Sequence, residues 1–136
     1  MGHVPPGALS EAGDGAQLPG RQHRGAGARR PTLSRAEIGS LGERLAAERY
    51  AVWGFRVLGR NVRAAGAECD LLVTGTAGRV VVEVKTVTDG DPFAQVDDAK
   101  ERSLRRLAVS LGAARIDVVG VWLGADGARL HAIHGW

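Results

Sequence analysis

The stretch that most constrains the fold of this chain runs from Gly66 to Lys85 and reads GAECDLLVTGTAGRVVVEVK. It holds two apolar runs, residues 68–74 and 79–85, separated by the sequence GTAG. Short runs rich in Val and Leu on either side of a Gly-containing loop are typical of a β-hairpin. The stretch therefore predicts two antiparallel strands joined by a four-residue loop.

The predicted register decides which side chains share a face. If Thr74 pairs with Arg79, alternate positions of the two strands form one wholly apolar face, which is expected to be buried because one face of a sheet must pack on a core. This face comprises Cys69, Leu71, Val73, Val80, Val82 and Val84.

The other face of the predicted hairpin carries charge, with Asp70 opposite Glu83 and Glu68 opposite Lys85. Like charges directly opposed at a Cβ separation of about 5 Å repel each other. Such a pair is either a solvated acidic edge or a site for a divalent cation that prefers oxygen ligands. Lys85 favours the cation site, because the chain has only one other lysine, Lys100, and a compact ammonium suits a water molecule or a phosphate oxygen.

Length and composition exclude some classes of protein. A chain of 136 residues predicts one domain and whatever its ends contribute, and no apolar run is long enough to span a bilayer. The single cysteine, Cys69, excludes an intrachain disulfide and is typical of a reducing compartment. We therefore expect a cytoplasmic protein with no membrane partner.

The first 32 residues differ from the rest of the chain, being dense in Gly, Pro, Ala and Arg. Such a segment buries too little apolar surface to offset its ordering entropy, so residues 1–32 are expected to be a disordered basic tail and residues 33–136 the folded domain. Residues 1–35 carry a net charge of +3, which equals that of the whole chain. The tail is either an aid to non-specific phosphate binding or an extension without a function.

The flanking segments predict further helices and strands. Ser34-Arg-Ala-Glu37 is a capping-box pattern that begins a helix ending near Gly54, and a second helix is expected over residues 97–111. Strands are expected over residues 55–63, 115–123 and 129–134. The crossover through the second helix makes the strand at 115–123 parallel to the one at 79–85. The side chains of His131 and His134 are expected to point to opposite faces of the last strand, which makes them poor joint metal ligands. They are assigned no chemistry.

The ordered set of motifs resembles the core of the PD-(D/E)xK nuclease superfamily, which has the restriction-endonuclease-like fold. Within it, the chain resembles the YraN family of uncharacterised proteins, which are similar to archaeal Holliday junction resolvases. The matching segments are Gly39 to Glu43 with Ala47 and Tyr50, Gly54 with Arg60-Asn61, Gly66 to Leu71, Val82 to Lys85, Lys100, and Ile116 to Val119.

The resemblance implies an α/β fold with an α-β-β-β-α-β core, a mixed sheet flanked by helices. It also implies a metal-dependent endodeoxyribonuclease that acts on DNA, including branched DNA. Mg²⁺ or Mn²⁺ would be held by Asp70, Glu83, Glu43 and the backbone carbonyl of Val84. Periodicity alone makes Glu43 an ordinary exposed glutamate, so its role rests on the resemblance.

The remaining site residues follow from the same resemblance and the predicted register. Lys85 would orient the attacking water, and Glu68 would hold the ammonium of Lys85 in place. Lys100 and Arg60 would contact nucleic acid. Arg102 lies on the surface of the second expected helix, where it is either part of a solvated face or a further phosphate contact. Two alternatives stay open: a non-catalytic nucleic-acid-binding or assembly protein, and a homodimeric scaffold.

Overall fold

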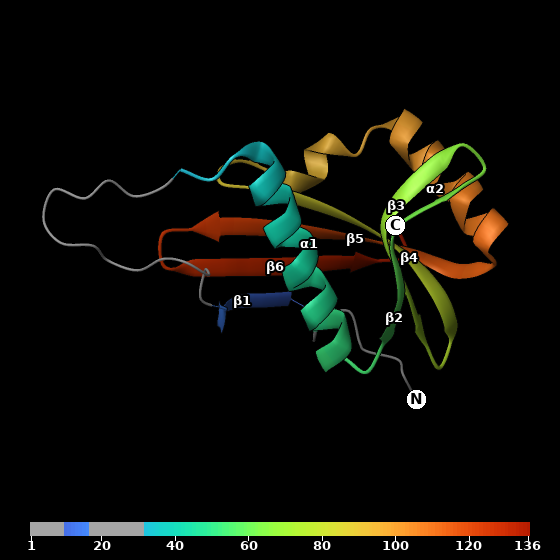
Figure 1. Cartoon of the computed structure of the whole chain (residues 1–136), viewed down its shortest axis with the longest axis horizontal. Helices are drawn as coiled ribbons and strands as arrows, with labels where there is room; N and C mark the ends of the chain where they lie inside the picture. The colour runs from blue at the N-terminus through green and yellow to red at the C-terminus, as the bar shows by residue number, and fades with distance from the viewer. Residues whose placement is uncertain (1–9, 17–31) are drawn as a thin grey trace, which may run out of the picture.

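The computed structural model describes residues 10–16 and 32–136, which form one sheet with a helix on each face (Figure 1). In chain order the elements are β1 (Ser10–Ala16), α1 (Arg35–Val52), β2 (Arg56–Ala64), β3 (Ala67–Gly75), β4 (Gly78–Val87), the short 3₁₀ helix η2 (Pro92–Gln95), α2 (Asp98–Leu111), β5 (Ala113–Gly124) and β6 (Gly127–His134). From α1 to β5 this is the predicted α-β-β-β-α-β order, so the fold class is confirmed.

The sheet is mixed, with the strand order β1-β6-β5-β4-β3-β2. Strands β2, β3 and β4 are antiparallel neighbours, whereas β4 and β5 are parallel, as the crossover through α2 predicts. In the described part of the chain, no helix is both long and apolar enough to cross a membrane.

Strand β1 departs from the expectation of a disordered tail, because Ser10–Ala16 pairs antiparallel with β6. Without β1, strand β6 would present a row of unpaired backbone groups at the edge of the sheet, and a further strand satisfies them. The rest of the predicted tail, residues 1–9 and 17–31, lies outside the described residues, so disorder there stays a prediction.

The ends of both helices follow the sequence signals. Ser34 and Glu37 form the predicted capping box, with Ser34 N donating to Glu37 Oε1 at 2.8 Å and Glu37 N donating to Ser34 Oγ at 3.1 Å. The carboxylate of Asp97 accepts from the backbone N–H of Lys100 at 2.8 Å. The capped first turn of α2 therefore fixes the backbone position of Lys100.

Each face of the sheet carries its own core. Helix α1 packs on the β3–β4 residues Leu71, Val73, Val80, Val82 and Val84, as the register predicts. Helix α2 covers the opposite face and buries Leu72 and Val81 there, so that face is not simply a charged surface.

The predicted register holds for only part of the hairpin. Thr74 pairs with Arg79, and the pairing continues to Leu71 with Val82, where it ends. Cys69 lies in the α2 core, so its predicted place beside Leu71 is wrong. The cause is Asp70, whose Oδ2 accepts from the backbone N–H of Val84 at 2.7 Å and thereby replaces the bonds of a regular ladder.

Candidate functional site

The centre of the site is Glu83, a carboxylate buried in the middle of β4 with 3% of its surface exposed. Its Oε2 lies 3.3 Å from Nζ of Lys85 and 3.4 Å from Nζ of Lys100. Lys85 is two residues further along the same strand and therefore points to the same face, whereas Lys100 comes from the first turn of α2. Burial of a carboxylate is unfavourable unless opposite charge accompanies it, and here two ammoniums do so.

Asp70 stands beside Glu83 at the point where β3 separates from β4. Because its Oδ2 accepts from Val84 N, Asp70 is held against β4 although the two strands no longer pair there. The structure thus brings the two predicted carboxylates together without the direct cross-strand pairing that the sequence predicted. Val84 contributes its amide to this arrangement, and a role for its carbonyl in metal binding stays a prediction.

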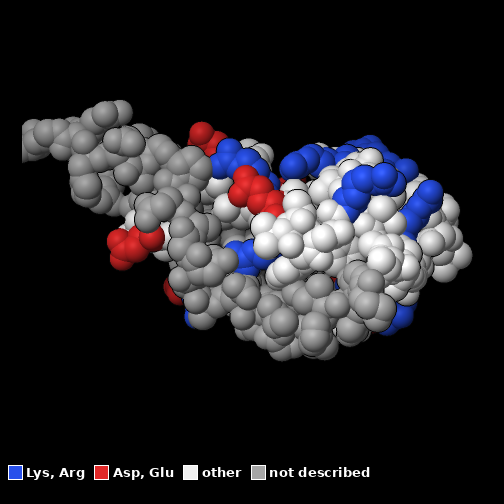
Figure 2. Space-filling model, turned by 90° about the horizontal axis from the view of Figure 1, so that it is seen from below, with Lys and Arg blue, Asp and Glu red and all other residues white. Residues whose placement is uncertain are grey.

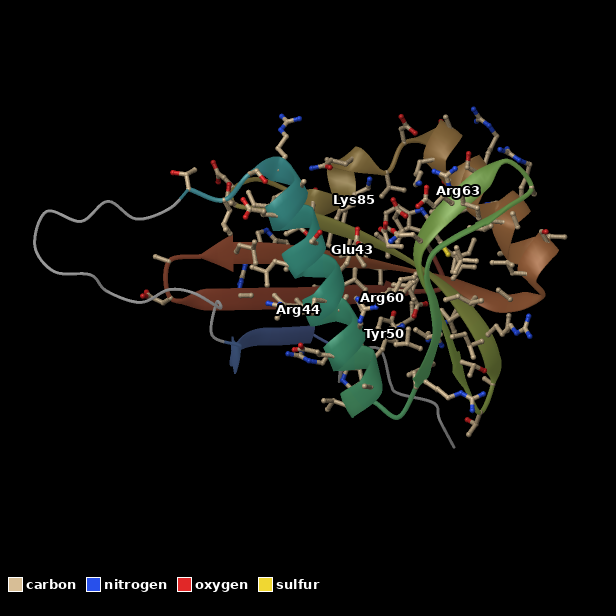
Figure 3. All side chains as sticks on the ribbon, viewed as in Figure 1. Glu43, Arg44, Tyr50, Arg60, Arg63 and Lys85 are labelled. Atoms are coloured by element: carbon tan, nitrogen blue, oxygen red, sulfur yellow. The ribbon has the colours of Figure 1, made fainter. Side chains whose placement is uncertain are left out.

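Glu43 reaches the same region from α1. Figure 3 shows Glu43 and Arg60 directed into the space between α1 and β2. Burial, the charge of Asp70 and a hydrogen bond to the Asp70 carboxyl group together raise the pKa of Glu43, and the positive charge of Arg60 opposes them. Two carboxyl groups can share a hydrogen bond only if one of them is protonated. A cation beside Glu43 and Asp70 would favour the ionised form of Glu43.

The surroundings of Glu83 also favour the binding of additional positive charge. Burial, followed by the charge of Asp70, raises the pKa of Glu83 to about 7, although Lys100 and Lys85 act in the opposite direction. The ionised form of Glu83 is therefore disfavoured even with two ammoniums beside it. Additional positive charge at this position would stabilise the ionised form.

The donor set fits a divalent cation in chemistry, because Mg²⁺ and Mn²⁺ prefer carboxylate oxygens. In residues 10–16 and 32–136, however, no three His, Cys, Asp or Glu side chains converge closely enough to hold a metal ion as they stand. The ammoniums of Lys85 and Lys100 lie beside Glu83 instead. Metal binding by Glu43, Asp70 and Glu83 would therefore require their side chains to move together.

The other predicted site residues lie around this centre. Glu68 pairs with Arg63 across the β2–β3 hairpin, with Oε1 of Glu68 3.3 Å from Nε of Arg63, so the predicted pairing of Glu68 with Lys85 is wrong. Arg60 and Arg102 are exposed on β2 and α2. In Figure 2, Lys and Arg side chains spread over the end of the visible face that lies toward β2, β3 and α2 in Figure 1.

An open hollow lies at the tip of the β2–β3 hairpin. Its volume is about 470 Å³, and Arg63, Ala64, Gly66, Ala67 and Glu68 line it. Glu68 is the one predicted site residue among them, and Glu43, Asp70 and Glu83 do not line it.

Sequence reasoning missed a second buried cluster, centred on Asp117, which is fully buried in β5. Its carboxylate accepts from Tyr50 Oη at 2.7 Å and from Arg115 Nε and Nη2 at 2.7 and 3.0 Å. His134 Nδ1 lies 2.7 Å from Oδ2, and the backbone N–H of Gly135 donates to Oδ1 at 3.3 Å. The sequence signal for this cluster was an aspartate inside an otherwise apolar strand, because a buried carboxylate requires hydrogen-bond or ion-pair partners.

Burial alone would raise the pKa of Asp117, but the hydrogen bonds from His134, Arg115 and Tyr50 together hold it below its usual value. Asp117 is therefore ionised throughout the neutral range and holds its partners in fixed positions. His134, to which the sequence assigned no chemistry, belongs to this cluster.

Comparisons with known proteins give consistent matches. A family model described as uncharacterised protein family UPF0102 matches residues 42–121. A UPF0102 protein of Mycolicibacterium smegmatis is 43% identical over 107 residues, covering 68% of this chain and 86% of that protein. UPF0102 proteins of Mycobacterium ulcerans and Mycobacterium tuberculosis are 40% and 39% identical, each over 68% of this chain and over 87% and 83% of their own lengths.

One solved structure with a weak likeness is that of Pyrococcus furiosus SfsA in complex with Ca²⁺. Its TM-score is 0.35 and its identity 14%, and the match covers 71% of this chain and 61% of that one. A likeness at this level carries no argument about the site.

Proposed function

This chain belongs to the uncharacterised protein family UPF0102, also known as the YraN family, and we propose that it is a metal-dependent endonuclease that hydrolyses phosphodiester bonds in DNA. The observation that carries the proposal is the buried Glu83, which shares one oxygen with Lys85 and Lys100 and lies beside Asp70. A structural role alone does not require two lysines and a second carboxylate around one buried glutamate.

In this proposal Asp70, Glu83, Glu43 and the Val84 carbonyl hold Mg²⁺ or Mn²⁺. The metal held by these residues would supply a water molecule of lowered pKa and would offset charge on the scissile phosphate. Lys85 is the group that orients the attacking water or stabilises the charge that develops on the phosphate. Lys100, which lies against Glu83 in the metal-free protein, would contact a phosphate oxygen of the bound DNA.

The proposed nucleic-acid contacts are Arg60 on β2 and Lys100 and Arg102 on α2. Contacts of this type neutralise phosphates and set the position of the duplex, but they do not read its sequence. We propose branched DNA as the preferred substrate, by analogy with the junction resolvases that the family resembles.

The test is cleavage of labelled DNA by the purified protein. A four-way junction, a linear duplex and a single strand are each incubated with Mg²⁺, Mn²⁺ or EDTA. Asp70→Ala tests the site, and Asp126→Ala, at an exposed residue of the β5–β6 turn, is the matched control. We expect metal-dependent cleavage that Asp70→Ala abolishes and Asp126→Ala retains. Equal cleavage by all three proteins would identify a contaminating nuclease and overturn the proposal.

A second candidate function is nucleic-acid binding without catalysis. It is favoured by one observation: Glu83 already has two ammonium partners, which offset part of its charge without a metal. Retained DNA binding with no cleavage of any substrate under any metal condition would support this alternative.

A further inference from the structure

Helix α1 carries two residues that interact with different parts of the sheet. Glu43 and Tyr50 are seven residues apart, which is close to two helical turns, so they lie on the same side of α1 about 10 Å apart along its axis. Glu43 meets Asp70, and Tyr50 meets Asp117 on β5. The position of α1 on the sheet therefore determines both contacts together.

The hydrogen bond from Tyr50 to Asp117 is held in place by the residues around both side chains. Asp117 is fully buried, and its two carboxylate oxygens have five contacts among the described residues. Arg115 and Gly135 contact Oδ1, and Arg115 and His134 contact Oδ2, the oxygen that accepts from the hydroxyl of Tyr50. Tyr50 therefore donates to an oxygen that its other partners already hold in place. Tyr50 is itself fully buried, and its ring packs edge-on against Trp53 and Phe55, with ring centroids 5.3 Å apart in both pairs.

Two turns before Tyr50, α1 is fixed by close packing against β4. A Cβ atom added at Gly42 would overlap the side chain of Thr86, so α1 lies directly against β4 at the residue before Glu43. Thr86 follows Lys85 in β4. Helix α1 is thus held on the sheet at Gly42 and at Tyr50, and Glu43 lies between these two contacts.

We propose that Tyr50 is a positioning residue of the candidate metal site: its hydrogen bond to Asp117 sets the height and rotation of α1 and so holds Glu43 against Asp70. The inference rests on the proposed function, in which Glu43 is a cation ligand. Tyr50 does not touch the cation or the substrate, and it acts only through the helix that it shares with Glu43.

The test compares Tyr50→Phe, which keeps the ring and removes the hydroxyl, with Leu107→Met, a conservative change in the α2 core on the other face of the sheet. The affinity for Mn²⁺ is measured by calorimetric titration in the full-length protein, together with the melting temperature. The same titration is made for Glu43→Gln and for the double variant Glu43→Gln/Tyr50→Phe.

We expect Tyr50→Phe to weaken Mn²⁺ binding about fivefold, in the range of measured couplings between interacting residues. Leu107→Met should leave the affinity unchanged even if it lowers the melting temperature as much. In the Glu43→Gln background, removal of the Tyr50 hydroxyl should have no further effect on affinity. Unchanged affinity in Tyr50→Phe, or an equal loss in both backgrounds, would overturn the inference.

A separate measurement distinguishes failure of the inference from failure of the proposed function. If the wild type binds no Mn²⁺, the proposed function has failed, and the inference is then judged on metal-free crystal structures of the wild type and Tyr50→Phe. Separation of the Glu43 and Asp70 carboxyl groups only in Tyr50→Phe would support the positioning role. An unchanged separation would refute it.

Discussion

At the scale of single residues, the site is defined by the conflict between burial and charge at Glu83. The carboxylate is inaccessible to solvent and lies beside Asp70, yet it has only two partly exposed lysines as counterions. In the folded protein its pKa is about 7, compared with an ordinary value near 4.5. Folding therefore favours the protonated form of Glu83.

This shift predicts how the stability of the metal-free protein depends on pH. A carboxyl group whose pKa is raised by folding stabilises the native state fully below pH 4.5, and this contribution is lost as the pH rises toward 7. Glutamine mimics the protonated form, so Glu83→Gln should match the wild type near pH 5 and be the more stable protein at pH 8. The upper limit of the difference is on the order of 3 kcal/mol.

Chemical denaturation of both proteins at pH 5 and pH 8 measures this difference, and the same samples report Mn²⁺ affinity, which Glu83→Gln should lose. Asp126→Asn, in the exposed β5–β6 turn, controls for the removal of one negative charge. A Glu83→Gln protein that is clearly less stable than the wild type at pH 8 would assign Glu83 a structural role as the partner of the two lysines.

At the scale of the helices and strands, the site depends on how closely α1 approaches β4. Gly42 permits that approach, because any side chain there would overlap Thr86. At Gly39, one turn earlier on the same helix, an added Cβ would meet no atom within 4 Å among the described residues, apart from the nearby backbone of α1 itself. The two glycines therefore form a natural pair for comparison.

Gly39→Ala should stabilise the protein by up to about 1 kcal/mol, since alanine favours a helix over glycine. Gly42→Ala should instead destabilise it by about 1–3 kcal/mol, because overpacking displaces α1 from the sheet. Denaturant titration gives both values, and Mn²⁺ titration should show weaker binding only for Gly42→Ala. Equal effects of the two substitutions would mean that the helix adjusts without moving Glu43.

The elements that local patterns specify were predicted well, and the contacts between distant segments were not. The capping box at Ser34 and the pairing from Leu71 to Thr74 follow from neighbouring residues, so they were visible in the sequence. The break in pairing at Asp70 was not, because it arises when a side chain takes the place of a backbone acceptor.

The same limit applies to the candidate site. Asp70, Glu83 and Lys85 were chosen from one hairpin and do lie together, whereas the link between Tyr50 and Asp117 joins residues 67 positions apart. Periodicity places Tyr50 on a face of α1 but does not show which strand that face meets. Asp117 was visible as an aspartate in an apolar strand, yet its partners could only come from the folded chain.

At the scale of the whole molecule, the proposed DNA surface includes Arg60 and Arg102, on β2 and α2. Affinity that depends on phosphate contacts falls as salt rises, with a slope set by the number of contacts. In EDTA, where cleavage is not expected, Arg60→Ala/Arg102→Ala should bind a DNA duplex more weakly and reduce the salt slope by about 2.

Arg129→Ala is the control for this measurement, because Arg129 is exposed on β6, and in the sheet β5, β4 and β3 lie between β6 and β2, the strand that carries Arg60. Fluorescence anisotropy at a series of salt concentrations gives the slopes. A double variant that retains the wild-type slope would show that the DNA lies elsewhere on the molecule.

The two lysines beside Glu83 bear on whether the protein must bind a metal before it can fold. In small zinc domains the metal supplies the folding energy, so the chain cannot fold before the ion arrives. Here the two ammoniums supply the countercharge from within the chain itself. We therefore expect the protein to fold in the absence of a metal, so that chelation abolishes the proposed activity but leaves a folded protein that can bind metal again.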